Sequence, residues 1–363
     1  MNSENQLLSA KSYLEQSELQ EQKFKVLYYL ENDFVRALGF MTPLAKCIGI
    51  ANVSEIVIDS TFKTNQERFE LFVVNANCGE YGMPLAYLYL LTLDGTEEAY
   101  QDPRNKINTR VQALCEFFST LRQTGLLPVF VLLDKDAGEI AAVSEAWSWT
   151  ANLQLCYWHL EHAINRRIKD KSKSTTYTAA KASDAYKQFD FVDPKWIPQG
   201  NSGTLCPEDS VKQLLELVKR HANMHPLIPI SKDTFWTSTE IYHASVKEIY
   251  QFCHSCGLVR LWYNKKDWKL FARSAFPTAM PIARTTMITE SHWRVLKHNY
   301  KYNYNRPRLD RLTQILAKQL VPDFKVKLVH YNLNRGFPTW WQAFKKDWNK
   351  AATASIQPEI PCG

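Results

Sequence analysis

The stretch Val129-Phe130-Val131-Leu132-Leu133-Asp134 consists of five apolar residues followed by a carboxylate. An unbroken apolar run of this kind, coming after Gly125 and Pro128, predicts a strand that is buried on both faces of a sheet. Asp134 would then lie where the strand leaves the sheet, at the edge where α/β proteins bind ligands. An acid at that edge favours metal or phosphate chemistry. The alternative is an ordinary strand-end residue that caps a helix over 137–149.

The composition is that of a globular chain with room for a large core. The 363 residues are 45% hydrophobic and 22% charged, which fits one large core with an insertion, or two domains. No apolar run approaches the roughly 18 residues that a membrane span requires, and the polar N-terminal sequence has no signal-peptide core. We therefore expect a soluble intracellular protein with no membrane partner. The eight scattered cysteines predict reduced thiols.

The positive charge is concentrated in two places. The net charge of +7 is a mild bias toward polyanions. One basic group lies at 166–173, and a second lies at 294–311, where it alternates with Trp293, Tyr300, Tyr302 and Tyr304. Basic and aromatic residues in this mixture suit contact with a nucleic-acid backbone and stacking on bases. A solvated basic helix face is the alternative.

The pattern around these stretches predicts an α/β fold. Two β-rich runs around Asn32-Asp33 predict a hairpin after a polar, helical or frayed leader at 1–22. Three strands in succession, then a helix, indicate a sheet with an antiparallel start. The predicted strands are 55–61, 68–76, 83–93, 129–134 and 153–155, and the predicted helices are 107–124, 137–149 and 162–169. From 207 to about 276 the pattern is helical and aromatic, and it predicts an all-α insertion. Helices opening at Thr285 or Thr286 and over 309–320 follow.

Two predicted strands end in an aspartate, and a later helix offers a third acid. If the strands of Asp59 and Asp134 are neighbours, their carboxylates share one crevice and repel unless cations neutralise them. Oxygen ligands suit Mg²⁺ or Mn²⁺. A pair of such ions about 4 Å apart can drive phosphodiester cleavage. Glu290 is the candidate third acid, and Arg294 and Lys297 share its helix face, where they could hold the DNA backbone.

Four motifs occur in order along the chain: Asp59-Ser-Thr-Phe-Lys-Thr-Asn, Leu132-Leu-Asp134-Lys-Asp-Ala-Gly-Glu-Ile, Cys156-Tyr-Trp-His159-Leu and Thr286-Met-Ile-Thr-Glu290-Ser-His-Trp-Arg. Together they resemble the Mutator-like element (MULE) transposases, fungal members in particular, over about residues 24–320. The resemblance implies an RNase H-like mixed sheet flanked by helices that carries an Asp-Asp-Glu triad. It also implies a Cys-x2-His motif after the second Asp and an all-helical insertion before the Glu.

The resemblance also implies an activity and its partners. Asp59, Asp134 and Glu290 would be the catalytic residues and would hold two Mg²⁺ or Mn²⁺ ions. The enzyme would cut double-stranded DNA at the terminal inverted repeats of a transposon and join the freed 3′-hydroxyl to target DNA. Such a protein acts in the nucleus, and pairing of two transposon ends favours a homodimer. Asp136 is a rival second acid, but we prefer Asp134 because the apolar run stops there.

Cys156 and His159 have two interpretations. A Cys-x2-His pair can be half of a zinc site, with Cys253 and Cys256 as the other half. We favour the other interpretation, in which the pair lines the catalytic crevice or contacts DNA. Trp158, between them, is expected to pack in the core.

The motifs divide the chain into five parts: an N-terminal leader and hairpin region (1–50), the first part of the core (51–168), a linker with the helical insertion (169–280), the final core helices (281–320) and a tail (321–363). Two features depart from the family pattern. The sequence shows neither an obvious N-terminal DNA-binding module nor a C-terminal zinc knuckle, and the aromatic stretch at 259–268 is shorter than expected. They favour the runner-up, a catalytically silent, transposase-derived DNA-binding or regulatory protein. A cellular RNase H-like nuclease is a third reading.

Overall fold

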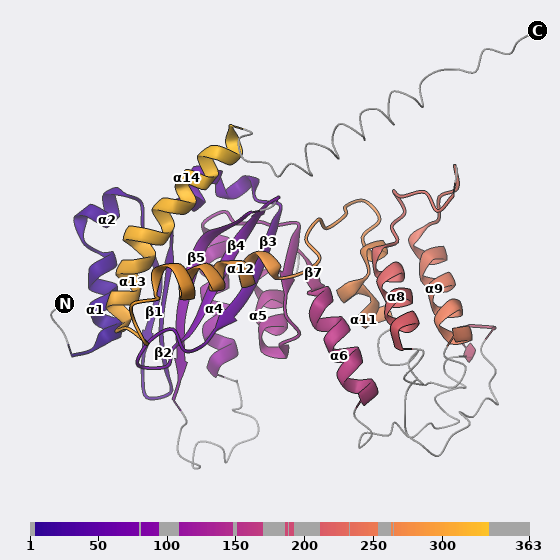
Figure 1. The fold of residues 1–363 in the computed structure, drawn as a ribbon, viewed down its shortest axis with the longest axis horizontal. Coiled ribbons are helices and arrows are strands. Elements are labelled where there is room, and N and C mark those ends of the chain that lie inside the picture. The colour runs from indigo at the N-terminus through magenta and orange to yellow at the C-terminus, as the bar shows by residue number, and fades with distance from the viewer. Residues whose placement is uncertain are drawn as a thin grey trace, which may run out of the picture.

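A seven-stranded mixed sheet forms the centre of the computed structural model (Figure 1). The structure describes residues 4–79, 81–93, 109–147, 151–169, 186–187, 189–191, 211–231, 233–252, 263 and 265–333. The strand order is β1-β2-β5-β4-β3-β6-β7. The strands are β1 (Lys25–Glu31), β2 (Val35–Met41), β3 (Glu55–Thr61), β4 (Glu70–Cys78), β5 (Tyr81–Thr92), β6 (Phe130–Leu133) and β7 (Asn152–Leu155).

The direction of the strands changes at β3. Neighbouring strands in the order β1-β2-β5-β4-β3 pair antiparallel, whereas β3, β6 and β7 pair parallel. The predicted hairpin is confirmed, because β1 and β2 pair around Asn32-Asp33 and extend the sheet beyond β5. Residues 1–50 therefore contribute to the same sheet as the rest of the core. The apolar run at 130–133 is buried as predicted, whereas Val129 before it is exposed.

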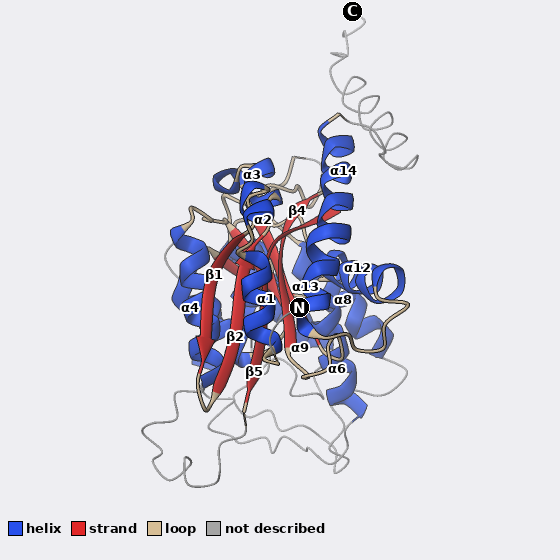
Figure 2. Ribbon diagram, turned by 90° about the vertical axis from the view of Figure 1, so that its left-hand side faces the viewer, coloured by secondary structure: helices blue, strands red, loops and turns tan. Residues whose placement is uncertain are grey.

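Two helices cover one face of the sheet. They are α4 (Thr109–Gln123), as predicted from its spacing of apolar residues, and α5 (Ala137–Trp147). Helix α4 lies close to β2 because Gly39 has no side chain: a Cβ there would stand 2.5 Å from Cδ2 of Phe117. Figure 2 shows α4 on the opposite side of the strands from α12 and α14.

The other face is covered by helices from both ends of the chain. These are α1 (Gln6–Leu14), α12 (Met287–Val295), α13 (Leu309–Ile315) and α14 (Val321–Asn332), with a π-helical turn over 316–320 joining the last two. The hydroxyl of Ser9 donates to Asp310 at 2.8 Å, which fixes α1 on α13. The N-terminal leader is thus a packed helix, with Leu7 and Leu14 fully buried. Short helices α2 (Ser17–Glu21) and α3 (Leu44–Ile48) complete this part.

The segment after β7 builds a second, smaller core. Leu160 and Ile164 of helix α6 (Tyr157–Lys169) share this core with apolar side chains of α8 (Val211–Asn223), α9 (Ser238–Phe252) and α11 (Lys265–Phe271). The described part of the predicted insertion is accordingly helical. Among the described residues, no helix is long and apolar enough to cross a membrane. Cys253, Cys256, much of 259–268 and the Trp-rich tail lie outside the described residues.

Candidate functional site

Asp59 lies near the end of β3, and Asp134 directly follows the neighbouring parallel strand β6. Strand β3 pairs with β6 so that Glu55 faces Phe130 and Val57 faces Leu132, an offset of 75 residues. The same offset sets Asp134, the residue after β6, opposite Asp59. Parallel strands end at one edge of a sheet, so both acids reach that edge. The sequence predicted this juxtaposition only on the condition that the strands were neighbours, and they are.

The two acids are electrostatically coupled. Burial raises the pKa of Asp59 to about 7, and the nearby charges of Asp134 and Glu290 act in the same direction. Hydrogen bonds from the Ser60 amide and the Trp293 indole lower it in part. A buried carboxyl that is surrounded by other acids is costly to ionise without a cation.

Helix α12 brings Glu290 to the same edge. The indole Nε1 of Trp293 donates to Oδ2 of Asp59 at 3.0 Å. Glu290 precedes Trp293 by three residues and therefore shares its helix face. Seven residues after Glu290, Nζ of Lys297 donates to the Thr61 hydroxyl at 2.6 Å, at the end of β3. The face that carries Glu290 thus runs along the acidic end of β3.

Buried polar contacts guide the chain into α12. The carboxylate of Glu55 accepts hydrogen bonds from the amides of Ile282 at 3.0 Å and Ala283 at 3.1 Å. The amide of Tyr157 donates to the carbonyl of Arg284 at 2.8 Å. These bonds hold the return segment from the helical insertion against β3 and the start of α6. They explain how an acid 156 residues after Asp134 in the sequence reaches the same sheet edge.

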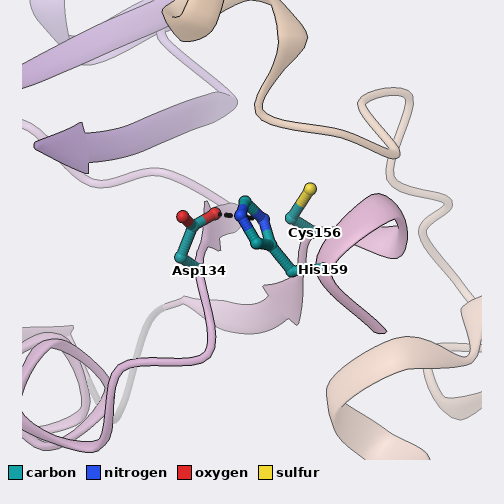
Figure 3. Close-up of side chains that lie close together, drawn as sticks. All are labelled: Asp134, Cys156 and His159. Carbon is teal, nitrogen blue, oxygen red and sulfur yellow. Dashed lines mark ion pairs between the residues drawn. The ribbon is translucent and has the colours of Figure 1, made fainter. Parts of the chain in front are cut away.

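Cys156 and His159 join Asp134 at this edge (Figure 3). Nδ1 of His159 lies 2.8 Å from Oδ1 of Asp134. The buried Cys156 thiol accepts from the amide of Thr286 at 3.3 Å and from its hydroxyl at 3.4 Å. That hydroxyl also lies 3.2 Å from Oε1 of Glu290. One chain of contacts therefore links Asp134, His159, Cys156, Thr286 and Glu290.

The contacts among these residues favour the charged forms of His159 and Cys156. Hydrogen bonds with Asp134 and Cys156 raise the pKa of His159 to about 10, against the effect of burial. Burial raises the pKa of the Cys156 thiol, but hydrogen bonds from His159 and Thr286 outweigh it and leave the pKa below its usual value.

The structure gives other roles to two residues near the site. Oδ1 of Asp136 accepts from the amide of Glu139 at 2.8 Å, so Asp136, not Asp134, is the residue that caps the helix after the strand. The prediction that Trp158 packs in the core was wrong. Its side chain is 51% exposed and stacks on His162 with 5.2 Å between ring centroids. The basic side chains from 167 to 173 lie outside the described residues.

No family model matches the chain. The mating-type protein ALPHA3 of Kluyveromyces lactis is 21% identical over 349 residues, which cover 86% of this chain and 36% of that protein. The chain thus spans about a third of the length of this curated relative. Among solved structures, the Drosophila P element transposase strand transfer complex is similar to this chain at 10% identity and a TM-score of 0.21. The alignment covers 77% of this chain and 66% of the transposase chain.

Sequence reasoning missed an ion-pair network beside the acids. The guanidinium of Arg110 on α4 lies 3.0 Å from Glu70, 3.1 Å from Asp136 and 3.2 Å from Glu139. The Ser60 hydroxyl, next to Asp59, donates to Glu70 at 2.7 Å. The signal in the sequence is weak: Glu70 directly precedes four apolar residues of β4, and Glu139 lies on the buried face of α5.

We expect Glu139 to make stability depend on pH. Burial and the neighbouring Asp136 raise its pKa from the usual 4.5 to about 8, although Arg110 opposes them. Between these values the folded state keeps a proton that the unfolded state releases, so the free energy of unfolding falls as the pH rises from about 4.5 to about 8. Urea unfolding at several pH values should record a smaller fall in Glu139→Gln. Equal slopes in the two proteins would refute this assignment.

Proposed function

We propose that this chain is the catalytic domain of a DDE transposase of the MULE type. Asp59, Asp134 and Glu290 would be its catalytic residues. The observation that carries the proposal is the convergence of these three acids at one sheet edge, with two on parallel strands in register and the third on a helix bonded to Asp59 through Trp293. The four ordered motifs support the same assignment.

The donor set fits hard divalent ions. Three carboxyl groups offer oxygen ligands, and burial together with mutual repulsion raises the pKa of Asp59, a cost that a cation removes. Asp59, Asp134 and Glu290 would hold two Mg²⁺ or Mn²⁺ ions. When bound, such ions activate a water or 3′-hydroxyl and stabilise the leaving oxygen of a phosphodiester. This chemistry needs no covalent intermediate with the protein.

The protein's own residues would hold these acids in place. Trp293 orients one oxygen of Asp59 by its indole hydrogen bond, and Thr286 contacts Glu290. His159 fixes one oxygen of Asp134. The other oxygen of Asp59 accepts a hydrogen bond from the amide of Ser60 at 2.8 Å. Such restraint lowers the cost of ordering ligands when substrate binds.

The sheet topology supports an RNase H-like core within this proposal. The segment β5-β4-β3-β6-β7 consists of three antiparallel strands followed by a parallel pair, and helices flank both faces. The acids lie where the parallel part begins. In this interpretation the β1-β2 hairpin extends the five-stranded RNase H-like sheet beyond β5.

Double-stranded DNA is the proposed partner, as transposon ends and as target, and the nucleus is the proposed location. A basic and aromatic surface adjoins the acids and supports this partner. Nζ of Lys301 bonds the carbonyl of Lys63 at 2.9 Å, which joins the loop after β3 to the segment after α12. Phe62 and Tyr302 are exposed by 58% and 71% on these two segments. Exposed rings beside lysines suit stacking and phosphate contact. A homodimer would hold two ends together.

We expect Lys297 to contribute to DNA affinity. Lys297→Gln removes one charge beside Asp59 and should lower the slope of log affinity against log salt by about one. Fluorescence anisotropy with a labelled duplex over a salt series measures this slope. Lys318→Gln is the matched control, since Lys318 is a lysine paired with Glu18 on α2. Equal slopes in the two variants would exclude Lys297 from the DNA contact.

The proposal is tested by metal binding and DNA nicking measured together. Calorimetry with Mg²⁺ and Mn²⁺, beside a supercoiled-plasmid nicking assay, should detect both binding and metal-dependent nicking. Metal binding without nicking would favour the catalytically silent, DNA-binding alternative. Absence of metal binding at millimolar ion would refute the proposed site. Preference for an RNA–DNA hybrid would identify a nuclease of the RNase H class instead.

A further inference from the structure

A second cluster of ligand-type atoms lies beside the carboxylates. Asp134, Cys156 and His159 each offer one atom, and these atoms lie within 4.8 Å of one another (Figure 3). Two backbone features bring them together. Cys156 immediately precedes α6 and His159 lies in its first turn, while the Cys156 amide donates to the carbonyl of Leu133 at 2.9 Å. That bond ties the thiol-bearing residue to the residue before Asp134.

The chemistry of this donor set differs from that of the three carboxylates. Thiolate, imidazole and carboxylate together are ligands of Zn²⁺, which binds them in tetrahedral sites with three protein ligands and one open position. Mg²⁺ takes oxygen ligands and has little affinity for sulfur. Glu290 lies outside this group of three, and Thr286 contacts both its carboxylate and the Cys156 sulfur.

The surroundings of the sulfur suit a metal ligand better than a nucleophile. Cys156 has no solvent exposure, so a bulky substrate could not reach it. Asp134 and His159 have side chains exposed by 26% and 28%, which gives a small ion a route from solvent. The amide and hydroxyl of Thr286 both donate to the sulfur. Such outer hydrogen bonds typically orient and tune metal-bound thiolates.

We propose that Asp134, Cys156 and His159 form a site for a thiophilic divalent ion of the Zn²⁺ class. The ion would replace the direct contact between His159 and Asp134 and would tie the end of β6 to the start of α6. Asp134 belongs to both sites, so a bound ion would also fix the second catalytic acid of the proposed transposase. The site itself does not rest on that function. Cys253 and Cys256, the partners considered from the sequence, lie outside the described residues.

Cobalt provides the test, because Co²⁺ substitutes for Zn²⁺ and reports sulfur ligation by a thiolate-to-cobalt charge-transfer band in the near ultraviolet. Titration of the whole chain with Co²⁺ should produce this band and intense visible bands of tetrahedral cobalt. Stoichiometric Zn²⁺ should abolish them, and excess Mg²⁺ should not. Absence of the charge-transfer band in the folded wild type would overturn the proposal.

Variants identify the ligands. Cys156→Ser should lose the charge-transfer band, and His159→Gln should weaken cobalt binding at least tenfold, with circular dichroism to establish folding. Cys115→Ser is the matched control, because Cys115 is also buried and lies 3.2 Å from a carboxylate, that of Glu145. If either test variant is unfolded, the other decides the question. A band unchanged in a folded test variant would overturn the proposal.

The same measurement separates this site from the proposed catalytic function. Asp59→Asn and Glu290→Gln should lose nicking yet keep the cobalt charge-transfer band, since neither supplies one of the three ligands. A chain that nicks DNA but gives no band would keep the transposase proposal and refute the zinc-class site. A chain that gives the band but never nicks DNA would keep the zinc-class site and refute the transposase proposal.

Discussion

Asp59→Asn, Asp134→Asn and Glu290→Gln are each expected to lower metal-dependent nicking by roughly a thousandfold or more, since the ions they hold contribute several kcal/mol to the transition state. Initial rates of plasmid nicking at saturating Mg²⁺ measure the loss. DNA affinity, measured without metal, should change little, because the acids do not attract the phosphate backbone.

The fold of these variants should survive. Asparagine at 59 keeps an oxygen for the Trp293 indole and removes a charge whose burial and repulsion raise the pKa of Asp59 to about 7. We therefore expect the unfolding free energy of Asp59→Asn to equal or exceed that of the wild type near neutral pH. Loss of nicking in a stable protein would locate the defect in catalysis.

Asp136→Asn is the control for the second acid. Asparagine caps helices about as well as aspartate, so α5 should remain intact. Nicking should persist in Asp136→Asn because Asp136 serves as the cap of α5 and as a partner of Arg110. Loss in Asp136→Asn with full activity in Asp134→Asn would transfer the role of second acid to Asp136.

Arg110→Met is expected to destabilise the fold by about 3–5 kcal/mol, the typical cost of removing one partner from a buried ion pair. Its guanidinium is the shared partner of Glu70, Asp136 and Glu139, and it also lies over the ring of Phe72. Methionine fills similar space but leaves Glu70 and Asp136 without this cation, close to the carboxylates of the proposed site. Urea unfolding near neutral pH measures the change.

Arg122→Met is the matched control on the same helix. Arg122 donates to the carbonyl of Ala146 at 3.1 Å, so its loss should cost only about 1 kcal/mol. Combining Arg110→Met with Glu70→Gln should recover part of the stability, because residues in one network do not act additively. Equal destabilisation by the two arginine variants would mean that the shared ion pairs contribute nothing beyond an ordinary hydrogen bond.

Local pattern predicted the elements that carry the acids. The apolar run at 130–133, the helical spacing over 107–124 and the hairpin at Asn32-Asp33 each depend on near neighbours in the sequence, and each matches the structure. The same reasoning failed for Trp158, because an aromatic residue in a first helical turn can face either solvent or core. Its exposure depends on what packs beside α6.

The local sequence pattern predicts which strands end in acids and which residue types accompany them. Which of these residues lie in contact depends on the tertiary structure. The parallel register of β3 and β6 set Asp59 opposite Asp134, and contacts from Glu55 and Thr286 brought back a helix from far along the chain. Cys156 and His159 likewise lie beside Asp134 through tertiary packing. Arg110 forms ion pairs with Glu70 on β4 and Glu139 on α5. Such contacts join residues distant in sequence, where spacing carries no information about proximity.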